Sequence, residues 1–290
     1  MKNSFNNLKP TYSFEIFPPK GTGNLASVFA TIDELASLSP DLISVTYGAG
    51  GTSRENTVEI ASKIQNSYNI PSVAHLTCVG ATKASLDTIL DKLQANGVKN
   101  ILALRGDLVD NEQLGEFKYA SDLIEYIKKK YNFTVFAACY PEKHPEAENL
   151  KTDIEHLKIK VDAGADVLIT QLFFNNEDFL RFRDKVRAAG INTPIETGIM
   201  PITSASQVTR MVNLCGATLP DVIKKKLSAY GHNSMAMKEA GIAYAVEQIS
   251  DLLASEVDGI HLYTMNLPAI AKRISESLRG ILYSRRVKCD

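Results

Sequence analysis

The sequence predicts an α/β fold, a single (β/α)8 TIM barrel with extra helices between strands seven and eight. Three observations support this prediction. Short apolar and β-branched runs alternate with amphipathic stretches, which is typical of βαβ units and a parallel sheet. These runs number eight, and the 290-residue chain has a usual length for one such barrel, which takes about 250 residues before insertions. We therefore expect residues 1–290 to form one barrel domain.

The predicted strands are the runs richest in β-branched and apolar residues. They are Tyr12–Phe17, Leu42–Tyr47, Ser72–Thr77, Ile101–Arg105, Thr134–Tyr140, Val167–Phe173, Pro194–Ile199 and Gly259–Tyr263. Helices are expected between them, for example at Ser53–Ser67, with Thr52 or Ser53 as the N-cap, and at Ala84–Ala95. Three helices are predicted to end at a glycine in a left-handed conformation before the next strand, at Gly97, Gly164 and Gly190.

The regular spacing of strands is broken once. Thr203–Val257 is long enough for an extra helix or two, including the segments LPDVIKKKLSAY and MKEAGIAYAVEQISDLLAS. Because no Pro, Gly or Ser-rich linker separates this segment, it is interpreted as decoration of the barrel and not as a second domain. The C-terminal SRRVKCD is expected to be a solvated tail.

Composition and charge exclude several classes of partner. Lys and Arg total 32 against 33 Asp and Glu, so no overall field attracts nucleic acid or an anionic membrane, and small molecules or proteins are the expected partners. The four cysteines form no CxxC pair, which predicts neither a disulfide framework nor a metal or iron–sulfur site. Without the apolar run of a signal peptide or a membrane span, the protein is expected in the cytoplasm.

Glu15 is the first candidate for chemistry. It lies near the C-terminal end of the first predicted strand, where barrel enzymes place catalytic groups. Its sequence neighbours in SFEIFPPK are aromatic and apolar, so burial is expected to raise its pKa and to keep a neutral carboxyl that can donate a proton. The alternative is a core glutamate paired with a lysine such as Lys20.

Polar or small residues also follow the second and third strands. Thr46 is followed by Gly48, Gly50 and Gly51, which would let the backbone approach a ligand, although by themselves they favour a plain turn. His75 is suited to bind a ring or a phosphate, or to serve as a structural hydrogen-bonding group.

The ends of strands four to six complete the set. Arg105 and Asp107 flank a glycine, and the alternative to a role in the site is a simple ion pair between them. Tyr140 and His144 lie in a proline-containing loop expected over the barrel mouth. Gln171, beside two phenylalanines, offers a neutral amide that suits the edge of a flat heterocycle. No Schiff-base lysine, HExxH or GxSxG pattern is present, which leaves acid chemistry on a bound heterocycle with a cofactor for electron transfer.

These motifs resemble one known family. SFEIFPPK, SVTYGAGGTSR, HLTC, ILALRGD, YPEKHPEA, KVDAGADVLITQLFF, GIMPI and HLYTMN occur in this order, as in the catalytic barrel of methylenetetrahydrofolate reductases of the bacterial MetF type, over nearly the whole chain. The resemblance implies a flavoprotein that binds FAD and reduces 5,10-methylenetetrahydrofolate to 5-methyltetrahydrofolate by ping-pong hydride transfer. NADH or NADPH is the implied reductant.

The resemblance also implies roles for individual residues. Glu15 would be the general acid, Asp107 would act in catalysis and bind folate beside the flavin, and Gln171 would bind the pterin edge. The positions implied for FAD are Thr46, His75, Leu104, Arg105, Gly106, Asp107, Tyr119, Ala120, Tyr140, His144, Asp153 and Lys160. Arg105 and Lys160 suit a diphosphate, and Asp153 suits ribose or adenine. For Tyr119, Asp153 and Lys160, the alternative is a solvated helix face.

Four positions depart from the family pattern. Leu267 stands where an arginine is common, Ala205 stands where a bulky aromatic is common, and His156 and Ile159 replace polar residues. We infer retained chemistry with altered partners. One alternative is the same reaction with electrons from an iron–sulfur partner subunit; others are a non-catalytic folate-binding subunit and a phosphate-binding barrel lyase. A homo-oligomer is compatible with each.

Overall fold

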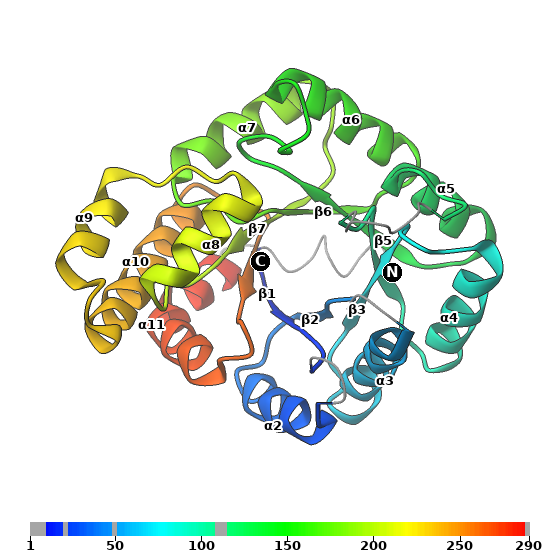
Figure 1. Cartoon of the computed structure of the whole chain (residues 1–290), viewed down its shortest axis with the longest axis horizontal. Helices are drawn as coiled ribbons and strands as arrows, with labels where there is room; N and C mark the ends of the chain where they lie inside the picture. Colours follow the sequence, from blue (N-terminus) through cyan, green and yellow to red (C-terminus); the bar gives the residue numbers. More distant parts are fainter. Residues whose placement is uncertain (1–9, 20–22, 48–50, 108–114, 288–290) are drawn as a thin grey trace. The chain divides into compact units, whose positions relative to one another are not determined.

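The eight parallel strands form a closed barrel in chain order (Figure 1). A computed structural model describes residues 10–19, 23–47, 51–107 and 115–287. The strands are β1 (Thr11–Ile16), β2 (Leu42–Val45), β3 (Ser72–Thr77), β4 (Asn100–Leu104), β5 (Thr134–Cys139), β6 (Val167–Thr170), β7 (Ile195–Ile199) and β8 (Gly259–Tyr263). The predicted (β/α)8 barrel is confirmed.

Helices follow the strands throughout the described part of the chain. They are α2 (Leu25–Ala36), α3 (Gly51–Ser67), α4 (Lys83–Ala95), α5 (Ala120–Lys130), α6 (Leu150–Asp162), α7 (Asn176–Ala188), α8 (Ala205–Cys215), α9 (Asp221–Tyr230), α10 (Ser234–Ala254) and α11 (Pro268–Val287). None of the helices in this described part is long and apolar enough to cross a membrane.

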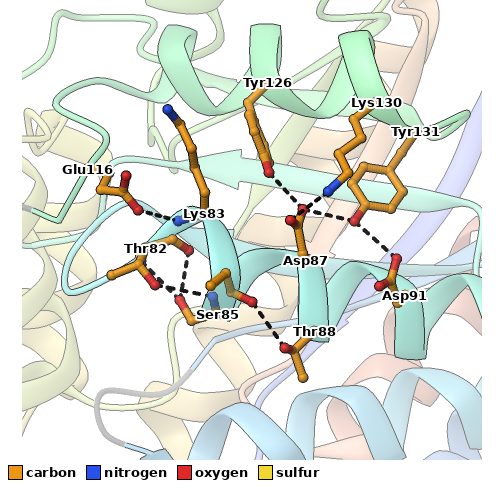
Figure 2. A network of polar contacts seen from close by, with 11 residues as sticks. Thr82, Lys83, Ser85, Asp87, Thr88, Asp91, Glu116, Tyr126, Lys130 and Tyr131 are labelled. Atoms are coloured by element: carbon orange, nitrogen blue, oxygen red, sulfur yellow. Dashed lines mark hydrogen bonds and ion pairs between the residues drawn. The ribbon is translucent and has the colours of Figure 1, made fainter.

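The element boundaries correct several predictions. Because α3 begins at Gly51, Thr52 and Ser53 lie inside its first turn and do not precede it as a cap. Helix α4 is capped by Thr82, whose side chain accepts a hydrogen bond from the Ser85 N–H (Figure 2). The predicted left-handed glycines are confirmed, with φ of 75° at Gly97, 115° at Gly164 and 78° at Gly190.

By its internal contacts the chain divides into two compact units. The N-terminal unit comprises Ser13–Ala138 and Lys158–Leu168, and the C-terminal unit comprises Met1–Tyr12, Cys139–Leu157 and Ile169–Asp290. In the N-terminal unit β1 to β5 pair in parallel order, with Glu15 opposite Ser44 and His75 opposite Leu102. In the C-terminal unit β7 pairs with β8.

The C-terminal unit contains the predicted insertion. Three helices, α8, α9 and α10, lie between β7 and β8 (Figure 1, yellow to orange), and cover a buried cluster that includes Phe174, Met200 and Ile202. Helix α11 continues to Val287, so the first residues of the predicted tail SRRVKCD are helical, with Ser284 exposed and Arg285 and Arg286 half-buried. Residues 288–290 lie outside the described residues.

Candidate active site

Three polar side chains meet on neighbouring strands of the N-terminal unit. Glu15 Oε2 accepts a hydrogen bond from Ser44 Oγ at 3.5 Å and lies 3.6 Å from His75 Nε2. They meet because β1, β2 and β3 are adjacent and Glu15 is in register with Ser44. The Glu15 side chain is 19% exposed and that of His75 is 5% exposed. The carboxyl is therefore held from one side and still accessible to a ligand.

The surroundings of Glu15 differ from the prediction. Phe14 and Ile16 are fully buried, but successive strand residues point to opposite faces, so these apolar neighbours do not surround the carboxyl. The polar Ser44 and His75 are among its spatial neighbours. Lys20, the alternative partner, lies outside the described residues. The sequence reasoning missed Ser44, although a polar residue within the apolar run LISV was a usable signal.

Thr46 follows β2 and continues the pairing of its backbone. Its N–H donates to Ile16 O at 3.0 Å, and its carbonyl accepts from Thr57 Oγ1 at 2.9 Å. Its own side chain is half-buried. Gly51 begins α3, whereas Gly48 and Gly50 lie outside the described residues. The predicted glycine-rich approach to a ligand therefore stays a prediction.

The chain after β4 makes a turn that only glycine fits well. Gly106 has a φ of +86°, and a Cβ there would lie 3.0 Å from Val79 Cγ2 and 3.1 Å from Thr77 Cβ. Before the turn, Leu104 ends β4, and the Arg105 carbonyl accepts hydrogen bonds from the N–H groups of the loop after β3. Asp107 is exposed at its far end. Residues 105–107 thus present backbone and an accessible carboxylate beside β3.

Tyr119 and Ala120 lie at the start of α5, in the same unit. The Tyr119 carbonyl accepts from Cys78 Sγ at 3.3 Å, its N–H donates to Asp122 Oδ2 at 2.9 Å, and its side chain is 52% exposed. Burial raises the pKa of the Cys78 thiol to about 12, so this thiol stays a neutral donor. The backbone is fixed while the Tyr119 ring is exposed, with Lys118 Nζ 5.0 Å from its centroid.

A polar network around Asp87 attaches α5 to α4 (Figure 2). Asp87 accepts hydrogen bonds from Tyr126 at 2.7 Å and Tyr131 at 2.9 Å, and Lys130 Nζ lies 2.5 Å from its other oxygen. Glu116 Oε2 accepts from the Lys83 N–H at 2.6 Å (Figure 2). The Asp87 contacts attach the second half of α5 to α4, and Glu116 attaches the segment before α5 to the first residue of α4.

The loop after β5 is organised by Asp153 in the C-terminal unit. Asp153 Oδ2 accepts from the His144 N–H at 2.9 Å, and the rings of Tyr140 and His144 meet edge to face at 4.7 Å. Asp153 is only 9% exposed, so the solvated-face alternative is wrong for it. In the N-terminal unit, the half-buried Lys160 donates from Nζ to Ala138 O at 2.6 Å, so its amine too is engaged with the protein.

Gln171 directly follows β6. Its Oε1 accepts from the Leu172 N–H at 2.8 Å, and its own N–H donates to Cys139 O at 2.7 Å. The two phenylalanines that follow it, Phe173 and Phe174, are each 1% exposed, so their rings pack inside the protein. Phe173 stacks on Phe179 at 5.5 Å, and Phe174 belongs to the buried cluster under α8 to α10.

The departures from the family pattern lie at accessible positions. Ala205 is the first residue of α8 and is half-buried, while Leu267 is 40% exposed before α11. His156 and Ile159 are exposed on α6. In the part of the chain that the structure describes, no group of three His, Cys, Asp or Glu residues is placed to hold a metal ion.

Comparison with known proteins gives one consistent family. A sequence model described as methylenetetrahydrofolate reductase matches residues 1–279. The chain is 38% identical over 272 residues to methylenetetrahydrofolate reductase (NADH) 1 of Arabidopsis thaliana, covering 88% of this chain and 46% of that protein. It is 36% identical over 266 residues to 5,10-methylenetetrahydrofolate reductase of Escherichia coli, covering 92% of this chain and 90% of that protein. The chain thus spans about half the length of the plant relative.

A solved structure supports the fold. An uncharacterized protein from Clostridium thermocellum, described as binding two copies of 5-methyl-5,6,7,8-tetrahydrofolic acid, superposes with a TM-score of 0.67. The match covers 93% of this chain and 97% of that chain at 15% sequence identity. At this identity the likeness concerns the barrel alone.

Proposed function

The chain belongs to the methylenetetrahydrofolate reductase family, and from this premise we propose that it reduces 5,10-methylenetetrahydrofolate to 5-methyltetrahydrofolate with Glu15 as general acid. The observation that carries the proposal is the Glu15 carboxyl near the C-terminal end of β1, which accepts a hydrogen bond from Ser44 Oγ and lies 3.6 Å from His75 Nε2. In a parallel barrel, the strand C-terminal ends are where catalytic groups lie.

The proposed chemistry needs one proton and one hydride. Glu15 donates its proton to a nitrogen of the folate, the bridging C–N bond breaks, and the methylene carbon becomes an iminium that accepts hydride. Ser44 on β2 donates a hydrogen bond to the carboxyl, and His75 on β3 lies beside it. The exposed Asp107 and the amide of Gln171 are proposed to bind the folate, and Asp107 also acts beside the flavin.

The residues after the strands suit FAD, which would accept hydride from the reductant and pass it to the folate. Gly106 makes the tight turn that ends in the exposed Asp107, Tyr119 offers an exposed ring, and Arg105 and Lys160 offer cations. We propose that these residues hold FAD together with Thr46, His75, Leu104, Asp107, Ala120, Tyr140, His144 and Asp153. The NADH in the name of the plant relative supports a nicotinamide reductant. Because one flavin would serve both half-reactions, we propose ping-pong kinetics.

One anaerobic titration tests the reaction and its electron donor. The purified chain is expected to be yellow, to bleach with NADH or NADPH, and to regain its colour when methylenetetrahydrofolate is added. Bleaching by neither nucleotide, with folate reduction after dithionite, would instead support an iron–sulfur partner as electron donor. A colourless protein that FAD does not reconstitute would contradict the flavin proposal.

Glu15→Gln tests the acid. A neutral amide cannot donate the proton, so folate turnover is expected to fall by about 10²–10⁴-fold while flavin reduction by the nucleotide changes less than about twofold. Glu34→Gln, at an exposed glutamate on α2 of the same unit, is the matched control and is expected to be unchanged. Equal folate turnover in Glu15→Gln and in the control would refute the assignment.

A further inference from the structure

Three side chains of the C-terminal unit donate hydrogen bonds to backbone carbonyls on either side of Gln171. Tyr263 OH donates to Thr170 O at 2.6 Å, Gln248 Nε2 donates to Phe173 O at 3.1 Å, and Tyr244 OH donates to Phe174 O. The segment that carries the candidate folate-binding amide is therefore fixed by side chains from β8 and from the inserted helix α10.

One face of α10 provides most of this attachment. Tyr244, Gln248 and Asp251 are spaced four and three residues apart, which places them on the same side of a helix. At the start of α7, Asn176 Nδ2 donates to Gln248 O at 3.0 Å and to Asp251 Oδ2 at 2.7 Å. The face thus runs along residues 173–176.

Tyr263 holds the position nearest to Gln171, and β7 makes room for it. A Cβ at Gly198 would lie 2.7 Å from both Cε2 and the hydroxyl oxygen of Tyr263, and 2.3 Å from Thr170 O. Gly198 N–H donates to Thr170 Oγ1 at 2.8 Å. The tyrosine can cross β7 and reach the Thr170 carbonyl because residue 198 has no side chain.

The bond from Tyr263 acts on the peptide that enters Gln171. Thr170 O and Gln171 N belong to the same planar peptide group, so Tyr263 fixes its oxygen side while Cys139 O accepts from its N–H at 2.7 Å. Next in the chain, the Leu172 backbone N–H donates a hydrogen bond to Gln171 Oε1. This contact identifies Oε1 as the oxygen of the Gln171 side-chain amide, and Nε2 is then the end that can donate to a ligand.

We propose that Tyr263 is a positioning residue, which sets the direction in which Gln171 presents its amide donors to the folate. The inference rests on the proposed function and deepens it. The hydroxyl touches no reacting atom and acts through the Thr170–Gln171 peptide. Its loss should weaken folate binding and leave the reduction of the flavin by nucleotide unaffected.

Tyr263→Phe removes the hydroxyl and keeps the ring. We expect the Kd for 5-methyltetrahydrofolate, measured by calorimetry, and the KM for methylenetetrahydrofolate each to rise about tenfold, because small misplacements of a binding group are costly. The kcat at saturating folate and the rate of flavin reduction by NAD(P)H should change less than about twofold. Tyr244→Phe, which removes a hydroxyl from a carbonyl farther along the same segment, is the matched control, with an expected change below about twofold.

A double-variant cycle separates positioning from general loosening. If Tyr263 acts through Gln171, the effect of Tyr263→Phe on the folate Kd should vanish in a Gln171→Ala background. An unchanged Kd in Tyr263→Phe, an equal rise in both backgrounds, or an equal rise in Tyr244→Phe overturns the inference. Should Tyr263→Phe not fold, Thr170→Val serves as the second variant, because it removes the side-chain acceptor of the Gly198 N–H next to the Thr170–Gln171 peptide. A raised Kd is expected, and an unchanged Kd would count against the inference.

The wild-type chain distinguishes the two levels of failure. Binding of 5-methyltetrahydrofolate by the wild type with no effect of Tyr263→Phe refutes the positioning role alone. No folate binding and no turnover by the wild type refute the proposed function, and the inference with it.

Discussion

The perturbation with the largest expected effect on stability is Glu196→Ala, in the C-terminal unit. Glu196 on β7 is 1% exposed, its Oε1 accepts from Thr11 Oγ1 at 3.0 Å, and its Oε2 lies 3.5 Å from Nδ1 of the fully buried His261. The substitution removes both acceptor oxygens and leaves a hydroxyl and an imidazole that must find other partners inside the protein. Breaking a buried pair from one side costs about 3–5 kcal/mol.

That range sets the expected measurement. At about 2–4 °C per kcal/mol, Glu196→Ala should lower the Tm by roughly 6–20 °C, and urea unfolding followed by circular dichroism should show the matching loss of free energy. Glu196→Gln keeps the shape and one acceptor oxygen, so a loss of only about 1 kcal/mol is expected. In a cycle with His261→Ala, the two losses should be non-additive by more than about 1 kcal/mol. A loss under about 1 kcal/mol for Glu196→Ala, or simple additivity, would refute the reasoning.

Three further predictions concern the polar network, the turn and the loop around the candidate site. Hydrogen bonds from Lys130 and Tyr126 lower the pKa of Asp87 below its unfolded value of about 3.9. The ionised Asp87 carboxylate therefore contributes its full stabilisation above about pH 3.9, and this stabilisation is lost as the pH falls through the pKa of the folded state. Asp87→Asn should therefore lose less stability than the wild type in urea titrations between about pH 5 and pH 2; an equal loss would contradict this. Gly106→Ala is expected to lower the free energy of unfolding by about 1–2 kcal/mol, because residue 106 has a positive φ and an added Cβ would press on Val79 and Thr77. The control is Gly280→Ala in α11, where an added Cβ meets nothing, and this variant should be neutral or stabilised in thermal unfolding. Asp153→Ala removes the acceptor of the His144 N–H, so limited proteolysis should cut residues 140–149 faster than in the wild type, and an unchanged pattern would argue against this anchoring role.

The strand order was predictable from the sequence, but one boundary shows the limit of composition. β3 and β8 have the predicted bounds, whereas the strand predicted as Val167–Phe173 ends at Thr170. Leu172 and Phe173 are as apolar as strand residues because they are buried, yet side chains of α10 and β8 hold the carbonyls around them. A buried loop and a buried strand have the same composition, so the sequence could not separate them.

The candidate site was predicted as individual residues and not as contacts. Glu15 and His75 were each identified from their place near a strand end, but their approach to one another depends on the register between strands, which no local pattern specifies. Ser44 was missed for the same reason, because its contact with Glu15 depends on the register between β1 and β2. Tyr263 and Gln248 were missed because they act on residues 93 and 75 positions earlier in the chain.

Those long separations bear on how the protein is made. The segment around Gln171 is attached to partners in α10 and β8, so the full set of contacts cannot form until residues up to Tyr263 have left the ribosome. At about 5–20 residues per second, the 93 residues from Thr170 to Tyr263 take roughly 5–20 s to synthesise. During that interval the apolar residues Leu172–Phe174 are not yet packed against α10. A nascent chain stalled before α10 would therefore be a natural client for a chaperone, and the proposed folate site would be completed late in translation.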